Sequence, residues 1–183
     1  MAGAAHPIPD QVRQRAGKIR LAAFDVDGTL TDGRLWFDRD GNETKAYHVQ
    51  DGLGLRLLAD SGIAVALITA RDSASARARA RDLRIEHVFT GVGDKLACLK
   101  SLCTKLGMDL SEVAYMGDDL ADLSVFPHVG LAVAPANGHD WIIDQVHWVS
   151  GQRGGEGAAR ELCDLILEQG GHRPAVLARF SAQ

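Results

Sequence analysis

The sequence has no long apolar run and no strong excess of charge of either sign. Its 183 residues are 46% hydrophobic and 24% charged, with a net charge of −4. No stretch reaches the ~20 apolar residues of a membrane-spanning helix, and the first eighteen residues lack the apolar core of a signal peptide. A weakly negative chain has no general attraction for nucleic acids or anionic membranes. These absences predict a cytoplasmic protein that binds neither nucleic acid nor membrane.

Cysteines are scarce as well. Cys98, Cys103 and Cys163 are odd in number and lack the paired spacing of a metal site. We therefore expect reduced side chains that fill space in the core. Histidines show no ligand spacing either, and we interpret these five as structural or exposed: His48, His87, His128, His139 and His147.

Short apolar runs alternate with helix-like segments along most of the chain. Strands are predicted at 19–24, 63–68, 88–89, 113–116, 131–133 and 148–149, and helices at 51–61, 73–83, 94–106 and 158–168. Continuous apolar runs of this length are typical of parallel strands that are covered on both faces. The alternation predicts an α/β fold with a Rossmann-like, doubly wound parallel sheet.

The chain length suits a single domain, which we place at residues 18–169, with flexible tails at 1–17 and 170–183. Between the first strand and the first helix, two short strands at 34–37 and 45–48 flank a turn at 38–42 and predict a β-hairpin. In the helix at 51–61, Leu53, Leu57 and Leu58 are expected on one side. Ser73 is a predicted N-cap.

Acidic residues follow two of the predicted strands directly. Asp25 and Asp27 come after the first strand, and Asp118 comes after the strand at 113–116. The carboxyl ends of strands are where open α/β sheets bind their ligands. Residues i and i+2 of an extended segment share a face. Asp25 is thus a candidate nucleophile toward phosphorus and Asp27 a candidate acid and base, with Gly28 allowing a sharp turn.

Clustered carboxylates repel one another and a phosphate dianion, so this chemistry needs a cation. Mg²⁺ prefers hard oxygen ligands and binds through a few carboxylates together with substrate phosphate. We expect it at the Asp25 carboxylate, the Asp27 backbone carbonyl and Asp118. Asp119 and Asp122 are expected to orient these ligands.

Two isolated polar residues complete the predicted site. Thr69 follows the run at 64–68, and its hydroxyl is suited to hold a phosphoryl oxygen. Lys95 is suited to neutralise another oxygen and to steady Asp25. Each piece alone is more often structural: a solvated turn, a threonine after a strand, or a surface lysine. Their order along the chain, each acidic segment behind a buried-type strand, favours a phosphoryl-transfer site.

The order of these motifs resembles that of the haloacid dehalogenase-like phosphatases: Asp25-Val26-Asp27-Gly28-Thr29-Leu30, then Thr69, then Lys95, then Gly117-Asp118-Asp119-Leu120-Ala121-Asp122. The flanking segments at 31–33, 50–56, 68–71 and 154–161 are similar to those of the 3-deoxy-D-manno-octulosonate 8-phosphate phosphatase subfamily. Ala70, Ser124 and Thr29 depart from the pattern of this subfamily. No carboxylate does.

The resemblance implies a magnesium-dependent phosphoric monoester hydrolase that acts through an aspartyl-phosphate in lipopolysaccharide biosynthesis. It implies Asp25 as nucleophile, Asp27 as acid and base, phosphate contacts from Thr69 and Lys95, and Mg²⁺ at Asp25, Asp27 and Asp118. A nine-carbon keto-sugar-acid phosphate or a broader range of sugar phosphates is the alternative substrate class. A phosphotransferase and a non-catalytic oligomerising domain are the alternatives from other classes.

The spacing of the motifs leaves room for a hairpin but not for a cap domain between Asp27 and Thr69. Leu35, Trp36, Phe37 and Tyr47 give the hairpin an apolar surface typical of an interface. The resemblance implies a homotetramer in which the hairpins pack together. Packing of these side chains within one chain is the alternative.

Two features stay open from the sequence. The glycine-rich segment at 154–157 is either a loop leading into a helix or a mobile segment that brings Arg153 or Arg160 to a site. The resemblance implies the second, with the segment lying near the substrate of an adjacent subunit. Arg71 either binds a sugar carboxylate or phosphate, or forms an ordinary surface ion pair.

Overall fold

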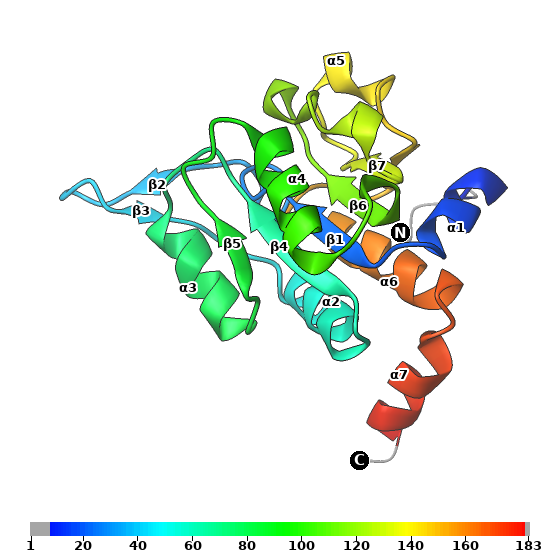
Figure 1. Cartoon of the computed structure of the whole chain (residues 1–183). Helices are drawn as coiled ribbons and strands as arrows, with labels where there is room; N and C mark the ends of the chain where they lie inside the picture. Colours follow the sequence, from blue (N-terminus) through cyan, green and yellow to red (C-terminus); the bar gives the residue numbers. More distant parts are fainter. Residues whose placement is uncertain (1–7, 182–183) are drawn as a thin grey trace.

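The structure is a computed structural model that describes residues 8–181. Its centre is a parallel sheet of six strands in the order β5-β4-β1-β6-β7-β8 (Figure 1). The strands are β1 (Leu21–Phe24), β4 (Ala64–Ile68), β5 (His87–Phe89), β6 (Val113–Met116), β7 (Leu131–Ala134) and β8 (Trp148–Val149). The chain runs outward from β1 to β5, then returns to β6 on the other side of β1. This reversal confirms the predicted doubly wound fold and puts the topological switch point between β1 and β6.

Helices cover both faces of the sheet. One face packs against α1 (Asp10–Ala16), α2 (Val49–Asp60), α3 (Ala74–Asp82) and α6 (Ala158–Gln169). The other face packs against α4 (Lys95–Leu106) and α5 (Asp140–Ile143). A short 3₁₀ helix, η1 (Leu110–Glu112), leads from α4 into β6, and two more, η2 (Leu120–Asp122) and η3 (Phe126–His128), lie between β6 and β7. Among residues 8–181, no helix has the length and apolar character that crossing a bilayer requires.

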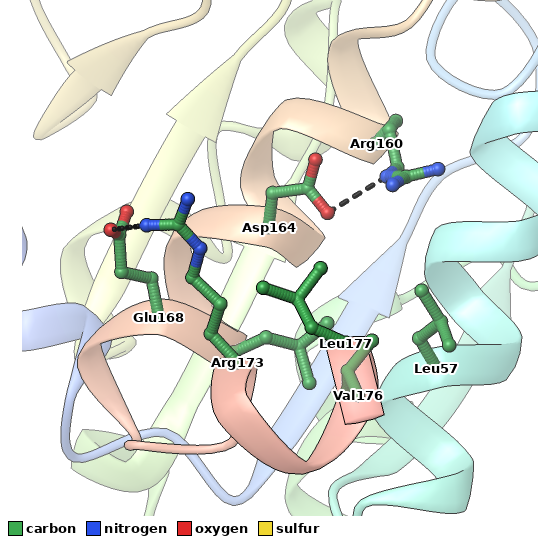
Figure 2. Close-up of a pocket in the computed structure, with 8 residues that line it drawn as sticks. Leu57, Arg160, Asp164, Glu168, Arg173, Val176 and Leu177 are labelled. Carbon is green, nitrogen blue, oxygen red and sulfur yellow. Dashed lines mark hydrogen bonds and ion pairs between the residues drawn. The ribbon is translucent and has the colours of Figure 1, made fainter. Parts of the chain in front are cut away.

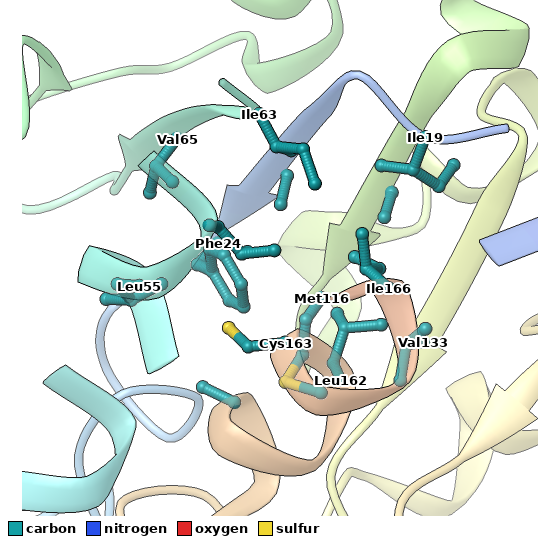
Figure 3. Close-up of a cluster of buried hydrophobic side chains, with 14 of the residues drawn as sticks. Ile19, Phe24, Leu55, Ile63, Val65, Met116, Val133, Leu162, Cys163 and Ile166 are labelled. Carbon is teal, nitrogen blue, oxygen red and sulfur yellow. The ribbon is translucent and has the colours of Figure 1, made fainter. Parts of the chain in front are cut away.

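Alternation along β1 divides its side chains between two cores. Phe24 contributes to the cluster beneath α2 and α6, where Figure 3 shows it beside Leu55 and Cys163. Leu21 and Ala23 contribute to the cluster beneath α4. Every residue of β1 is buried, which explains why the strand appears in the sequence as an unbroken apolar run. Cys163 and Cys103 are buried, and all three cysteines are free.

Side-chain caps define where α3 and α4 begin. The Ser73 hydroxyl accepts a hydrogen bond from the Ala76 backbone N–H, which confirms the predicted cap. The Asp94 carboxylate accepts one from Ala97 in the same way. This cap places Lys95 at the first residue of α4, at the carboxyl edge of the sheet.

The hairpin differs from the prediction in its second strand. It consists of β2 (Trp36–Phe37) and β3 (Glu43–Thr44), with Trp36 opposite Thr44. The predicted strand at 45–48 starts two residues too late. The Asp38 carboxylate accepts hydrogen bonds from the backbone of Asp40 and Asn42 and closes the turn tightly. Pairing therefore resumes at once after the turn.

The buried face of α2 also differs from the prediction. Leu57 and Leu58 are buried as expected, but Leu53 is 40% exposed and Leu55 takes its place in the core. The reason is that α6 packs directly against Gly54, where α2 has no side chain, and so determines which face of α2 is buried. A Cβ atom at Gly54 would lie 3.0 Å from the Cβ atom of Cys163.

The described parts of the predicted flexible tails are helical. Helix α1 buries Val12 and Ala16 in the cluster that also contains α6, so the ordered fold begins before the predicted boundary at residue 18. Helix α7 (Arg173–Ser181) has no buried residue. It borders a pocket with Leu57, and Arg173 pairs there with Glu168 at 2.9 Å (Figure 2). The rest of both predicted tails, residues 1–7 and 182–183, lies outside the described residues.

Candidate active site

Asp25 stands at the carboxyl end of β1, at the switch point of the sheet. Its backbone N–H donates to the Met116 carbonyl at 2.9 Å, which ties it to β6. Its side chain is largely buried, and the Lys95 ammonium lies 2.9 Å from Oδ1. Burial, together with repulsion from Asp122, raises the pKa of Asp25 to about 6 even though Lys95 acts in the opposite direction. The carboxylate is thus held in position but lacks enough positive charge around it.

Asp122 is fully buried, and both of its oxygens accept hydrogen bonds. Oδ1 accepts from Lys95 at 2.7 Å and from the Tyr115 hydroxyl at 2.6 Å. Oδ2 accepts from the backbone N–H groups of Asp118 at 3.0 Å and Asp119 at 3.3 Å. With its acceptor sites used in this way, Asp122 is built to orient Lys95 and the loop that carries Asp118.

Asp118 follows β6 and approaches the turn after β1. Thr29 donates a hydrogen bond to its Oδ1 at 3.0 Å. A Cβ atom at Gly28, whose φ is +87°, would lie 1.9 Å from Asp118 Oδ2, so glycine is required there. Burial raises the pKa of Asp118 to about 7, with further contributions from Asp25 and Asp122.

The donor set suits a hard divalent cation. Asp25, Asp118 and Asp122 each have a carboxylate oxygen within 4.8 Å of the others. Because four hydrogen bonds already use the acceptor sites of Asp122, Asp25 and Asp118 are the two carboxylates of this group with oxygen left for a cation. Mg²⁺ takes oxygen ligands of this kind. The raised pKa values of Asp25 and Asp118 indicate negative charge that such a cation would neutralise.

Thr69 and Asp119, two other predicted site residues, lie in different surroundings. Thr69 is buried at the carboxyl end of β4, and its Oγ1 accepts from the Arg71 N–H at 3.3 Å. Asp119 is exposed and caps η2 by accepting from the Leu120 N–H at 2.7 Å. The structure therefore places Asp119 in the turn beside the cluster rather than among its carboxylates.

Within the chain, Arg71 forms an ion pair, which is one of the two alternatives that the sequence left open for it. Its Nη2 lies 2.8 Å and its Nε 3.2 Å from Glu43 Oε2, so it forms an ion pair with the hairpin. Contact with a substrate group stays a prediction.

Lys45 is a residue of the site that sequence reasoning missed. Its side chain is wholly shielded from solvent, and its ammonium contacts Asp27 Oδ1 and lies 3.2 Å from Glu43. The other oxygen of Asp27, Oδ2, is buried without a hydrogen-bond partner in residues 8–181. The sequence signal for this contact is the i, i+2 spacing of Glu43 and Lys45, which puts both side chains on one face of an extended segment. The same spacing of charges is also common on exposed hairpins, so it does not by itself indicate a buried pair.

The glycine-rich segment packs against the turn at residues 28–31, which follows β1 in the same chain. The Gly155 N–H donates to the Thr29 carbonyl at 3.1 Å. A Cβ atom at Gly154 would lie 1.7 Å from the Gly28 carbonyl oxygen. Arg160 pairs with an acid of α6, Asp164, at 2.8 Å. Within its own chain the segment is a loop that leads into α6, and a contribution of Arg153 or Arg160 to a site on an adjacent subunit stays a prediction.

Comparisons with known proteins agree with this architecture. The chain matches the haloacid dehalogenase-like hydrolase family over residues 87–162. It is 45% identical over 161 residues to 3-deoxy-D-manno-octulosonate 8-phosphate phosphatase KdsC of Yersinia pestis, covering 88% of this chain and 86% of that protein. A crystal structure of a hypothetical protein from Xanthomonas campestris is 52% identical and superposes with a TM-score of 0.93, covering 96% of each chain.

A third relative was solved with ligands. The Moraxella catarrhalis 3-deoxy-D-manno-octulosonate 8-phosphate phosphatase, in complex with magnesium ion, phosphate ion and KDO, is 43% identical with a TM-score of 0.90. The alignment covers 93% of this chain and 98% of that one.

The six-stranded sheet and the carboxylates at its switch point define a haloacid dehalogenase-like hydrolase. Within this class, identity of 42–45% over most of the length of the curated relatives is decisive. The chain belongs to the 3-deoxy-D-manno-octulosonate 8-phosphate phosphatase family.

Proposed function

We propose that this protein is a magnesium-dependent phosphatase that hydrolyses 3-deoxy-D-manno-octulosonate 8-phosphate to KDO and inorganic phosphate, in the cytoplasmic synthesis of lipopolysaccharide. The observation that carries the proposal is the buried chain of contacts from Asp25 through Lys95 to Asp122, beside Asp118. A scaffold has no need of such a costly buried charge cluster. The family of the chain supports the choice of substrate.

In the proposed reaction, a carboxylate oxygen of Asp25 attacks phosphorus, and the bond from phosphorus to the sugar oxygen breaks. Asp27 gives its proton to that oxygen, so the sugar leaves as an alcohol. Water then attacks phosphorus of the aspartyl-phosphate and passes a proton back to Asp27, which releases phosphate and restores Asp25.

Charge neutralisation accompanies both steps. Lys95 lies 2.9 Å from Asp25 and is suited to bind a phosphoryl oxygen there, and Thr69 is suited to donate to another. When bound at Asp25, Asp118 and the Asp27 carbonyl, Mg²⁺ supplies the positive charge that lets a phosphate dianion approach these carboxylates.

We also propose that the protein is a homotetramer whose hairpins pack together. Trp36 is 60% and Phe37 59% exposed in the single chain, on a hairpin that extends away from the sheet (Figure 1). Exposed aromatic side chains on a projecting element are typical of an interface. A monomeric mass by light scattering at micromolar concentration would refute this assembly.

The test of function is release of inorganic phosphate from a panel of sugar phosphates with and without Mg²⁺. We expect the eight-carbon keto-sugar-acid phosphate to give the highest kcat/KM, and Asp25→Asn to lower it by at least about 10⁴-fold, because the nucleophile is lost. A wild-type rate equal to that of Asp25→Asn would favour a non-catalytic domain. A higher kcat/KM with a nine-carbon keto-sugar-acid phosphate would instead identify that sugar phosphate as the substrate.

A further inference from the structure

The hairpin is tied to the active site by the inner face of β3 and the residue that follows it. Glu43 and Lys45 have the i, i+2 spacing that puts side chains on one face of an extended segment, and both point into the domain. Trp36 and Phe37 of β2 are exposed. The two strands of the hairpin thus have different environments: the aromatic side chains of β2 face solvent, whereas the charged side chains of Glu43 and Lys45 face the domain.

Lys45 requires its partners in order to be buried. An ammonium group removed from water carries a large penalty unless opposite charges and hydrogen bonds replace the water. Here the two carboxylates of Glu43 and Asp27 flank it, and solvent reaches none of the Lys45 side chain. A buried lysine with these two partners has little freedom to move.

Glu43 is itself anchored to the domain. Its Oε2 accepts two hydrogen bonds from Arg71, and its Oε1 accepts one from Ser73 at 3.0 Å. Both partners belong to the segment between β4 and α3. A continuous set of contacts therefore runs from this segment through Glu43 and Lys45 to Asp27.

From these contacts we infer that Lys45 is a positioning residue for proton transfer by Asp27. The inference rests on the proposed phosphatase function. The Lys45 ammonium holds Asp27 by Oδ1, and Oδ2, which has no hydrogen-bond partner among the described residues, is the oxygen that carries the transferred proton. The hairpin is therefore part of the catalytic apparatus of its own chain, in addition to any role in assembly.

A loss of positioning has a signature that a loss of stability lacks. The sugar oxygen leaves as a poor alkoxide unless Asp27 Oδ2 delivers a proton as the P–O bond breaks. The phenolate of 4-nitrophenyl phosphate leaves without a proton. The value of kcat/KM reports the steps up to the first irreversible one, which here is departure of the leaving group. The ratio of kcat/KM for the sugar phosphate to kcat/KM for 4-nitrophenyl phosphate therefore measures how well the enzyme delivers the proton. The amount of folded enzyme cancels in this ratio.

The experiment compares Lys45→Met with wild type on 3-deoxy-D-manno-octulosonate 8-phosphate and on 4-nitrophenyl phosphate, at saturating Mg²⁺. We expect kcat/KM to fall about 100-fold for the sugar phosphate and less than about 10-fold for the aryl phosphate. Lys100→Met, which changes an exposed lysine on α4, is the matched control and should leave both values unchanged.

Two further variants separate positioning from other roles. Asp27→Asn should show the same preference for the aryl phosphate, and adding Lys45→Met to it should not change the ratio further, because both act through one proton. Glu43→Gln should give a smaller change in the same direction. Equal losses on both substrates, no loss, or an additive effect in the double variant would each overturn the inference. Failure of the wild type to release phosphate from either substrate would instead refute the proposed function, and it would be seen before any variant is compared.

Discussion

Binding of Mg²⁺ should compete with protons at this site over an unusually neutral pH range. The pKa of Asp25 is raised from 3.8 to about 6 and that of Asp118 from 3.8 to about 7, in both cases chiefly by burial. A carboxyl group must lose its proton to act as a ligand, so each group adds a proton-competition factor to the apparent Kd. Ordinary carboxylates would add almost none above about pH 5.5.

The size of the effect follows from the two pKa values. Between about pH 7.5 and about pH 5.5, the factor for Asp25 changes roughly 4-fold and that for Asp118 roughly 25-fold, a product of about 100-fold. The apparent Kd for Mg²⁺ should therefore rise about 100-fold as the pH falls. In the metal-free protein, the same two groups favour folding below pH 3.8, and this contribution is lost as pH rises through about 6 and about 7.

Isothermal titration calorimetry at the two pH values measures this directly. Asp118→Asn should weaken binding at the higher pH and reduce the pH effect to about 4-fold, since only Asp25 still titrates. Asp144→Asn changes an exposed aspartate at the end of α5 and should leave the full pH effect in place. A wild-type Kd that changes less than about 3-fold would refute the reasoning, because it would mean that the carboxylates are ionised at both pH values.

Two other substitutions test the supports of the site. Tyr115→Phe removes a hydroxyl that donates to a buried carboxylate at 2.6 Å, and should lower the free energy of unfolding in urea by about 1.5–3 kcal/mol. Tyr47→Phe, whose hydroxyl is buried without a hydrogen-bond partner in the described chain, should change it far less; equal losses would contradict the assigned role. Gly154→Ala would put a methyl group 1.7 Å from the Gly28 carbonyl oxygen and should cost about 1–3 kcal/mol with a drop in kcat, whereas Gly93→Ala, with open space around its Cβ, should be close to neutral in thermal unfolding. Full activity in Gly154→Ala would show that the loop behind the site can shift freely.

The sheet and the main carboxylates were predictable because each depends on local pattern. A parallel strand buried on both faces has to be continuously apolar, as in β1 and β6. Asp25 comes directly after β1 and Asp118 comes two residues after the end of β6, and adjacent parallel strands bring their carboxyl ends together. The two signals coincide at one edge of the sheet, so a site there follows from the sequence.

The features that were missed depend on contacts between distant segments. Helix α1 is only seven residues long, and its buried Val12 packs into a cluster completed by α6, far along the chain. Whether Leu53 or Leu55 is buried is decided by where α6 meets α2. The reach of Lys45 to Asp27 depends on where the second strand of the hairpin begins, which was predicted two residues too late. Periodicity along one segment contains none of this information.

The backing of the Gly28–Thr31 turn by Gly154 and Gly155 has a consequence for biosynthesis. The carboxylates and the lysine of the cluster all precede residue 123, yet the turn that follows Asp25 and Asp27 rests on backbone from beyond residue 150. A chain emerging from the ribosome has therefore translated every acid of the cluster long before it can hold them in place. This support is complete only when the chain has been translated past residue 155, so an early stop yields a protein with these carboxylates but without the backbone that holds the turn beside them.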